Sequence, residues 1–369
     1  MRKGLVLVLF VVLYGVGFAQ EVSLEEKVGQ LLVVGFKGYE PSAQVIEAIE
    51  EYNVGGVIFF DLSLSDKSPS GGYGSRNIES PAQLKRLVDS LQSIAQRAGL
   101  PELFIAIDQE GGKVNRLKAK YGFPESVSAE YLGQFSLDST IKYSIECAQT
   151  LSSVGVNINF APCVDLAVNP ENPIIAGKER AFSGSSDKVI SYSRAWIKQQ
   201  NSGGIITSLK HFPGHGSSLS DSHHGLTDIT STWSSTELKP YEVLIGEGYD
   251  DIVMIGHLFN SNFDEEYPAS LSKKTIDILR SEYQYDGVVA TDDMNMGAIV
   301  EHYSLSEALL LALNAGVDMV VMGNNAKVFE ADLVSRTHAI IMELVRSGRL
   351  SEGRIDEAYR RVMRLKERF

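Results

Sequence analysis

The chain has 369 residues, of which 44% are hydrophobic and 22% are charged, and its formal net charge is −13 at pH 7. These values exclude an intrinsically disordered chain and provide enough apolar residues for a large buried core. Because the charge is strongly negative and no segment is rich in lysine or arginine, we expect no binding to nucleic acid.

The first 19 residues differ in character from the rest of the chain. Arg2 and Lys3 precede an apolar run from Gly4 to Phe18, and Ala19 stands just before a charged segment. A basic start, a short apolar run and small residues at a polar boundary are typical of a secretory signal peptide. We therefore predict a signal peptide over residues 1–19, export to the periplasm or the extracellular space, and a mature domain over residues 20–369 without stable membrane insertion. An uncleaved membrane anchor is the alternative, although the run is short for spanning a bilayer.

Short apolar runs alternate with helical patterns along the remaining chain, and no change of composition marks a second domain. Nearly continuous apolar strands indicate burial on both faces, as in a parallel sheet. Eight strands separated by helices predict an α/β fold, a single-domain (β/α)8 TIM-type barrel, with a doubly wound open sheet as the alternative. The predicted strands are Gln30–Phe36, Val54–Phe60, Leu103–Ile107, Val156–Phe160, Gly204–Leu209, Asp251–Gly256, Gly287–Thr291 and Met319–Met322.

Two helices carry clear boundary signals, and a third is indicated by its amphipathic pattern. Ser80 is a candidate N-cap, followed by a proline at the first helical position, and Gln83 is placed to complete a capping box. A second helix is predicted to begin after Ser304 and to end at Gly316, where glycine is the favoured terminator. The segment 355–365 is predicted to form a final amphipathic helix.

One segment interrupts the alternation of strands and helices. Asp61–Ser75 follows the second predicted strand directly and is rich in serine, glycine and aspartate. We predict a long mobile loop at the carboxyl end of that strand, the end at which barrel enzymes build their sites.

Polar residues gather after three of the predicted strands. They are Asp108–Arg116 after the third strand, Lys210–His224 after the fifth and Asp292–Met296 after the seventh. Because a parallel barrel brings the carboxyl ends of its strands to one rim, we expect these segments to meet there.

Four of the seven histidines lie between His211 and His224. A metal-dependent hydrolase using His211, His215 and His223 is one interpretation, but their spacing matches no zinc motif. A solvated polar loop is another. Asp221 favours a third, because residues two apart in extended backbone face the same side and a carboxylate raises the pKa of a neighbouring imidazole. We therefore predict that Asp221 and His223 form an acid/base pair.

Asp292 stands at the end of a predicted buried strand. Lys210 and Arg180, predicted at the same rim, could keep its carboxylate ionised. An ionised carboxylate opposite a proton donor is the arrangement that glycoside hydrolysis requires. We predict that Asp292 is the reactive group and that Asp293 caps a helix.

With these motifs the chain resembles the bacterial β-N-acetylglucosaminidases of glycoside hydrolase family 3, from about Leu24 to Leu365. The most specific element is Lys210–Gly216 followed by Asp221–His223. Further support comes from Asp108–Gly112 with Arg116, from Arg180–Ser183 and from Thr291–Met294.

The resemblance implies a site without cofactor or metal. Asp292 matches the nucleophile of a retaining mechanism, His223 the acid/base and Asp221 its partner in an Asp-His dyad. The residues that match those holding the terminal sugar are Asp108, Arg116, Arg180, Lys210 and His211. The Asp-Ser-His segment places the chain in the single-domain branch of the family, and we expect a monomer.

The chain departs from the family at two places, of which the first keeps a cationic side chain and the second bears on the substrate range. Lys113 stands where the family usually has arginine, and Asp61–Ser75 looks inserted between Phe60 and Arg76. We expect an exo-acting enzyme that releases terminal β-N-acetylglucosamine from peptidoglycan fragments. The alternatives are a β-glucosidase or broad β-glycosidase, a phosphorylase in which phosphate replaces water, and a non-catalytic sugar-binding protein.

Overall fold

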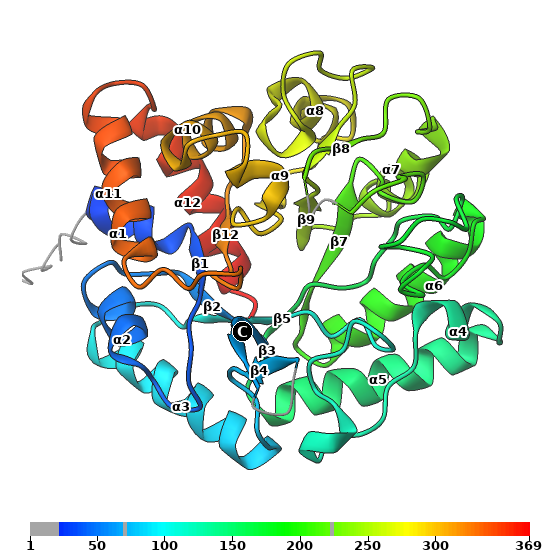
Figure 1. The fold of residues 1–369 in the computed structure, drawn as a ribbon, viewed down its shortest axis with the longest axis horizontal. Helices are drawn as coiled ribbons and strands as arrows, with labels where there is room; N and C mark the ends of the chain where they lie inside the picture. The colour runs from blue at the N-terminus through cyan, green and yellow to red at the C-terminus, as the bar shows by residue number, and fades with distance from the viewer. Residues whose placement is uncertain (1–21, 69–71, 222–224) are drawn as a thin grey trace, which may run out of the picture.

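The computed structural model describes residues 22–68, 72–221 and 225–369 (Figure 1). The predicted signal peptide over residues 1–19 and the predicted acid/base His223 lie outside these ranges. Among the described residues, no helix has both the length and the apolar character needed to cross a membrane.

Eight parallel strands form the centre of the molecule, in the order β11-β9-β7-β6-β5-β2-β1-β12. An isolated parallel bridge between Ala290 and Met319 joins the two end strands, so the sheet closes into the predicted (β/α)8 barrel. Each strand overlaps one predicted run, and β7 extends three residues beyond its prediction, to Phe212. The strands are β1 (Leu32–Gly35), β2 (Gly56–Phe59), β5 (Phe104–Ile107), β6 (Ile158–Asn159), β7 (Ile206–Phe212), β9 (Ile252–Ile255), β11 (Val288–Thr291) and β12 (Val320–Met322).

Helices surround the barrel and cover its outer face (Figure 1). They are α1 (Leu24–Gln30), α2 (Ala43–Glu50), α3 (Pro81–Arg97), α4 (Ala129–Gly133), α5 (Leu137–Ser153), α6 (Ser186–Ser202), α7 (Lys239–Gly246), α8 (Lys273–Asp277), α9 (Gly297–Val300), α10 (Leu305–Ala315), α11 (Leu333–Arg346) and α12 (Glu352–Lys366). A short 3-10 helix, η3 (Ser235–Leu238), leads into α7. Outside the barrel, β8 (Thr227–Asp228) pairs with β10 (Leu258–Phe259).

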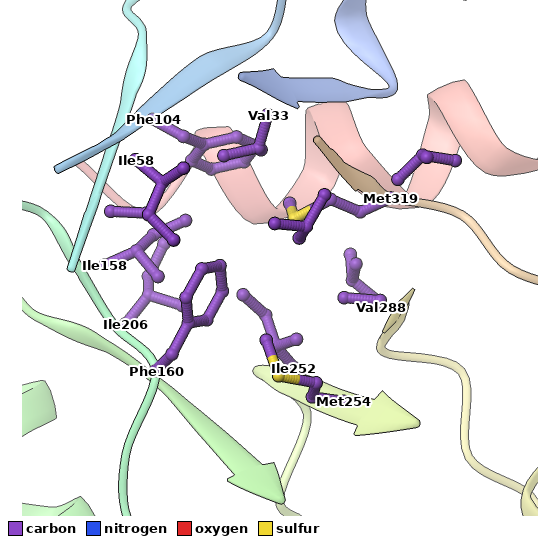
Figure 2. Packing of buried hydrophobic residues seen from close by; sticks show 14 of the residues in the cluster. Val33, Ile58, Phe104, Ile158, Phe160, Ile206, Ile252, Met254, Val288 and Met319 are labelled. Carbon is purple, nitrogen blue, oxygen red and sulfur yellow. The ribbon is translucent and has the colours of Figure 1, made fainter. Parts of the chain in front are cut away.

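The barrel interior is filled by buried apolar side chains. Figure 2 shows Val33, Ile58, Ile158, Ile252 and Val288 directed toward one another, and all of them are buried. Burial of each side chain of this size stabilises the fold by about 1.5–3 kcal/mol. The interior is therefore a packed core, and the polar residues of a site must lie at the ends of the strands.

The predicted helix boundaries are largely confirmed. The Ser304 side chain accepts from the Glu307 N–H in a complete capping box, and α10 ends at Gly316 with φ 117°. The Ser80 side chain accepts from the Gln83 N–H and caps α3. Gln83 does not complete a capping box with Ser80, because its Oε1 accepts from the Glu79 N–H and its Nε2 donates to backbone carbonyls.

The predicted loop over Asp61–Ser75 is a β-hairpin in its described part, which corrects the prediction. β3 (Leu62–Lys67) pairs antiparallel with β4 (Tyr73–Ser75). The hairpin is anchored by contacts to other loops at the carboxyl end of the barrel. Lys118 forms an ion pair with Asp61, and the Asn325 side chain accepts from the Leu64 N–H and donates to the Leu62 carbonyl. These strands pack on loops and not on the core. The short alternation of leucine and serine at the start of β3 therefore directs no apolar face to the core, since Leu62 is half-buried and Leu64 is 40% exposed.

Asp318 holds the closure between β11 and β12 at the opposite end of the barrel. It is 0% exposed, and its Oδ2 accepts from the Val289 N–H at 3.0 Å. Arg280, Arg354 and Arg361 form ion pairs with its two oxygens. One buried carboxylate therefore links β11, α12 and the helical turn after α8 that carries Arg280.

We expect Asp318→Ala to lower the free energy of unfolding by about 3–5 kcal/mol, because Arg280 loses its anion and Arg354 and Arg361 keep only Glu357 and Asp286. Denaturant unfolding followed by circular dichroism measures the change. Asp356→Ala is the control, since Asp356 pairs with Lys27 at the surface and is 53% exposed. Its effect should stay within about 1 kcal/mol. Equal effects of the two substitutions would contradict the role assigned to Asp318.

Candidate active site

The predicted site residues that the structure describes lie at the carboxyl end of the barrel. Asp108 follows β5 directly, Lys210 and His211 lie in the last residues of β7, and Asp292 follows β11 directly. Arg180 lies in the connection between β6 and α6. Because all eight strands are parallel, these side chains share one rim, as the sequence predicts.

A buried ion cluster joins most of the predicted sugar-binding residues. The Lys210 ammonium is 2.8 Å from Asp108 Oδ1 and 2.7 Å from Glu110 Oε1. Arg180 binds both oxygens of Glu110, at 2.8 and 2.7 Å, and Arg116 lies 3.3 Å from Asp108. Glu110 lies within the polar segment predicted after the third strand and had no predicted role, although it is the centre of the cluster.

Asp108, Glu110 and Lys210 are held in their charged forms at neutral pH. Burial would raise the pKa of Glu110, but the charges of Arg180 and Lys210 outweigh burial and hold that pKa well below its ordinary value. The pKa of Asp108 is likewise lowered, against burial, by Lys210 and Arg116. Burial would lower the pKa of Lys210, but its two carboxylate neighbours raise it. The cluster is therefore a permanent set of charged donors and acceptors.

His211 is fixed between this cluster and a carboxylate that sequence analysis missed. Its Nδ1 lies 2.7 Å from Asp165 Oδ2, and its Nε2 lies 3.0 Å from Arg180. Since arginine only donates, Nε2 accepts and the proton resides on Nδ1. Burial would raise the pKa of Asp165, but His211 and His215 lower it to about 2. Asp165 follows the fourth strand, so its position after a buried run was the signal that could have identified it.

The donor atoms around His211 do not fit a metal ion. Cys163, Asp165 and His211 place possible ligand atoms within 4.8 Å of one another. Both ring nitrogens of His211 are already hydrogen-bonded, and one of them contacts the cationic Arg180. Burial also raises the pKa of the Cys163 thiol well above its ordinary value, which opposes the thiolate that a metal needs. The group is better described as a hydrogen-bonded support for Arg180.

Asp292 and Asp293 have different surroundings. Asp292 is half-buried, and its Oδ1 accepts from the Asp293 N–H at 2.8 Å. Asp293 Oδ1 accepts from the N–H groups of Gly323, at 2.9 Å, and Asn295, at 3.0 Å. The prediction that Asp293 caps a helix is wrong, because the N-cap of α9 is Met296. Asp293 instead closes a turn and ties the end of β11 to the residue after β12.

The segment that follows β7 leads to Asp221, which is half-buried. Its start is held by two buried carboxylates. The His215 N–H donates to Asp165 Oδ1 at 2.7 Å, and the N–H groups of Gly216 and Ser217 donate to Glu237 Oε2 at 2.9 and 3.3 Å. Glu237 lies in η3, and nothing in its local sequence distinguished it from a surface glutamate.

Glu237 is 1% exposed, and its second oxygen, Oε1, is buried without a hydrogen-bond partner. Burial raises the pKa of Glu237 from 4.5 to about 7. The folded protein therefore keeps a proton on Glu237 over a pH range in which the unfolded chain has released it. Stability from this source is fully present below pH 4.5 and is lost as the pH rises to about 7.

We expect Glu237→Gln to remove this pH dependence. A rise from 4.5 to about 7 corresponds to about 3 kcal/mol. The free energy of unfolding of the variant minus that of the wild type should increase by up to about 3 kcal/mol between pH 4.5 and pH 8. Urea unfolding at the two pH values measures the difference, and a difference that stays constant with pH would contradict the assigned pKa.

Comparisons with known proteins identify the family of this chain. Residues 23–365 match the family described as "Glycosyl hydrolase family 3 N terminal domain". Beta-hexosaminidase A of Pseudoalteromonas piscicida is 29% identical over 94% of this chain and 62% of its own length. Beta-hexosaminidase LpqI of Mycobacterium tuberculosis is 28% identical over 95% of this chain and 84% of its own length.

Two solved structures extend the likeness to the fold. A family 3 β-N-acetylglucosaminidase from Paenibacillus sp. str. FPU-7 has 33% identity and a TM-score of 0.84, covering 94% of this chain and 62% of the other. A β-N-acetylhexosaminidase from Beutenbergia cavernae DSM 12333 has 25% identity and a TM-score of 0.82, covering 94% and 99%. This chain thus spans 62% of the length of the Pseudoalteromonas and Paenibacillus proteins. From the match over residues 23–365 and these likenesses, the chain belongs to glycosyl hydrolase family 3.

Proposed function

We propose that this protein is an exo-acting, retaining β-N-acetylglucosaminidase that hydrolyses terminal non-reducing β-N-acetylglucosamine. The observation that carries the proposal is the buried ion cluster at the same barrel rim as Asp292. This choice of sugar is supported by the similarity to proteins named β-hexosaminidase and β-N-acetylglucosaminidase.

The ion cluster is suited to bind the hydroxyl groups of one terminal sugar. Charged donors and acceptors form stronger hydrogen bonds with hydroxyls than neutral groups do. Lys210, Arg116 and Asp108 offer both kinds of group within one small region. Their mutual pairing keeps them in place before the sugar arrives, so that binding energy is not spent on ordering them.

The proposed reaction has two steps. In the first, His223 donates a proton to the glycosidic oxygen while a carboxylate oxygen of Asp292 bonds to the anomeric carbon. The bond from that carbon to the aglycone oxygen breaks, and its electrons leave with the aglycone alcohol. In the second, His223 removes a proton from water, the water oxygen bonds to the anomeric carbon, and Asp292 leaves as a carboxylate. Asp221 holds the imidazole of His223 in the required orientation.

We further propose that the enzyme is exported, acts as a monomer, and takes peptidoglycan fragments as its substrates. The basic and apolar character of residues 1–19 supports export.

The first test compares wild type and Asp292→Asn on chromogenic β-N-acetylglucosaminide and β-glucoside. We expect preferential cleavage of the N-acetyl substrate, unaffected by a chelator, and a loss of at least about a thousandfold in the variant. Preferential cleavage of the glucoside would establish the β-glucosidase alternative, and release of sugar 1-phosphate in phosphate buffer would establish the phosphorylase. Binding of N-acetylglucosamine without turnover by the wild type would establish a sugar-binding protein.

Asp293→Asn is the matched control for the nucleophile. Trapping with a slow mechanism-based substrate, followed by intact-mass spectrometry, should label the wild type and Asp293→Asn but not Asp292→Asn. Asparagine at 293 keeps an oxygen for the N–H groups of Gly323 and Asn295, so the turn can be retained. Labelling of Asp292→Asn would overturn the assignment of the nucleophile.

Asp221→Asn and His223→Ala test the acid/base pair through the leaving group. A poor leaving group needs the proton, whereas a nitrophenolate with a low pKa departs without it. We expect both variants to lose about a hundredfold or more in kcat/KM on an alkyl glycoside and far less on an activated aryl glycoside. Equal losses on the two substrates would argue against acid catalysis by this pair.

A further inference from the structure

Three successive backbone N–H groups, those of His215, Gly216 and Ser217, point into two buried carboxylates. Such a run of N–H groups forms a concave site that prefers an anion. Asp165 takes the first N–H and Glu237 takes the other two. The segment held in this way begins directly after β7 and leads to Asp221.

Glu237 is packed closely against this segment. A Cβ built on Gly214, whose φ is +119°, would lie 2.6 Å from the Cβ of Glu237. Only glycine permits this approach, because both the space and the positive φ exclude a larger side chain. The Glu237 carboxylate therefore reaches Gly216 and Ser217 because Gly214 leaves room for it.

The burial of this carboxylate is unfavourable for the fold. Its Oε1 is buried without a well-aligned hydrogen bond, and the nearby Ser217 side chain lowers the pKa of Glu237 without offsetting the effect of burial. A glutamine of the same shape would avoid the charge and still offer an oxygen to the two N–H groups. A buried acid that costs stability while it contacts a segment of the active site is a candidate for a functional role.

We propose that Glu237 is a positioning residue whose ionised carboxylate, through the N–H groups of Gly216 and Ser217, fixes the segment that carries Asp221. The inference rests on the proposed function, because it assumes that Asp221 belongs to the acid/base pair. Hydrogen bonds from N–H to a charged carboxylate are roughly twice as strong as those to a neutral carboxyl group. The segment is therefore held most firmly when Glu237 is ionised.

Several other titratable groups face Glu237, and their changes of charge must be distinguished from that of Glu237. Asp165 stays charged, because its pKa is lowered to about 2, and it acts to raise the pKa of Glu237. Burial lowers the pKa of His215 to about 4, so this imidazole is neutral at pH 6–8. On the α7 side, burial raises the pKa of the Tyr241 phenol well above its ordinary value. Glu237, with its pKa near 7, is therefore the member of this set that changes charge near neutrality.

The experiment measures kcat/KM against pH for the wild type and Glu237→Gln on the chromogenic N-acetylglucosaminide. Asp251→Asn is the matched control, because Asp251 is a buried carboxylate that accepts from the Thr207 N–H at 2.8 Å, at the opposite end of β7. We expect Glu237→Gln to lose roughly tenfold to a hundredfold in kcat/KM above pH 7, with KM little changed. The limb of the wild-type profile that rises through about pH 7 should disappear in this variant and remain in Asp251→Asn.

Amide hydrogen exchange of the peptide 214–221 at pH 8 provides a readout that does not require turnover. Exchange should be faster in Glu237→Gln than in the wild type and unchanged in Asp251→Asn. The inference is overturned if exchange and the shape of the pH profile are both unaffected, even where Glu237→Gln lowers stability. If the wild type cleaves neither sugar, the proposed function is refuted. A difference in amide exchange between the wild type and Glu237→Gln would then still support the structural role of Glu237.

Discussion

The site depends on one buried contact, in which the Lys210 ammonium lies between the carboxylates of Asp108 and Glu110. Lys210 is only 2% exposed, and removing an ion from water costs several kcal/mol unless it is paired. Lys210 comes from β7, the two carboxylates follow β5, and Arg180 completes the pairing of Glu110 from the connection after β6. A shift of any one of these segments would leave a buried charge without its partner. The charges thus hold three parts of the rim in one arrangement.

Asp165 and Glu237, which hold the segment after β7, show how the surroundings of a carboxylate determine its pKa. Asp165 and Glu237 accept from neighbouring N–H groups, yet the pKa of Asp165 is lowered to about 2 and that of Glu237 is raised to about 7. Asp165 has His211 beside one oxygen and the His215 N–H on the other. Glu237 has both of its N–H contacts on one oxygen and none on the other. One carboxylate is a fixed support, and the other changes charge near pH 7.

The sequence predicted most of the barrel because each strand is a short apolar run, and burial inside a closed sheet requires that pattern. It failed for the hairpin formed by β3 and β4, whose strands are stabilised by Asn325, Lys37 and Lys118 from distant loops. It also missed Asp165 and Glu237, since their roles arise from contacts with residues far along the chain. The polar residues after β5 and β7 could be predicted as a site because the parallel barrel brings them to one rim. Which of them pair with one another could not be predicted.

Asp292 and Asp293 illustrate the limit of such reasoning. They are adjacent acids after the same strand. The sequence offered no physical reason why Asp293, and not Asp292, should cap a helix. In the structure, Asp293 bonds to the Gly323 N–H and so joins the ends of β11 and β12. A Cβ on Gly323 would lie 2.4 Å from Asp293 Oδ2, so a glycine is needed for this approach. Because the Asp293 N–H in turn donates to Asp292 Oδ1, the position of the proposed nucleophile is set by the same contact that closes the barrel at this rim.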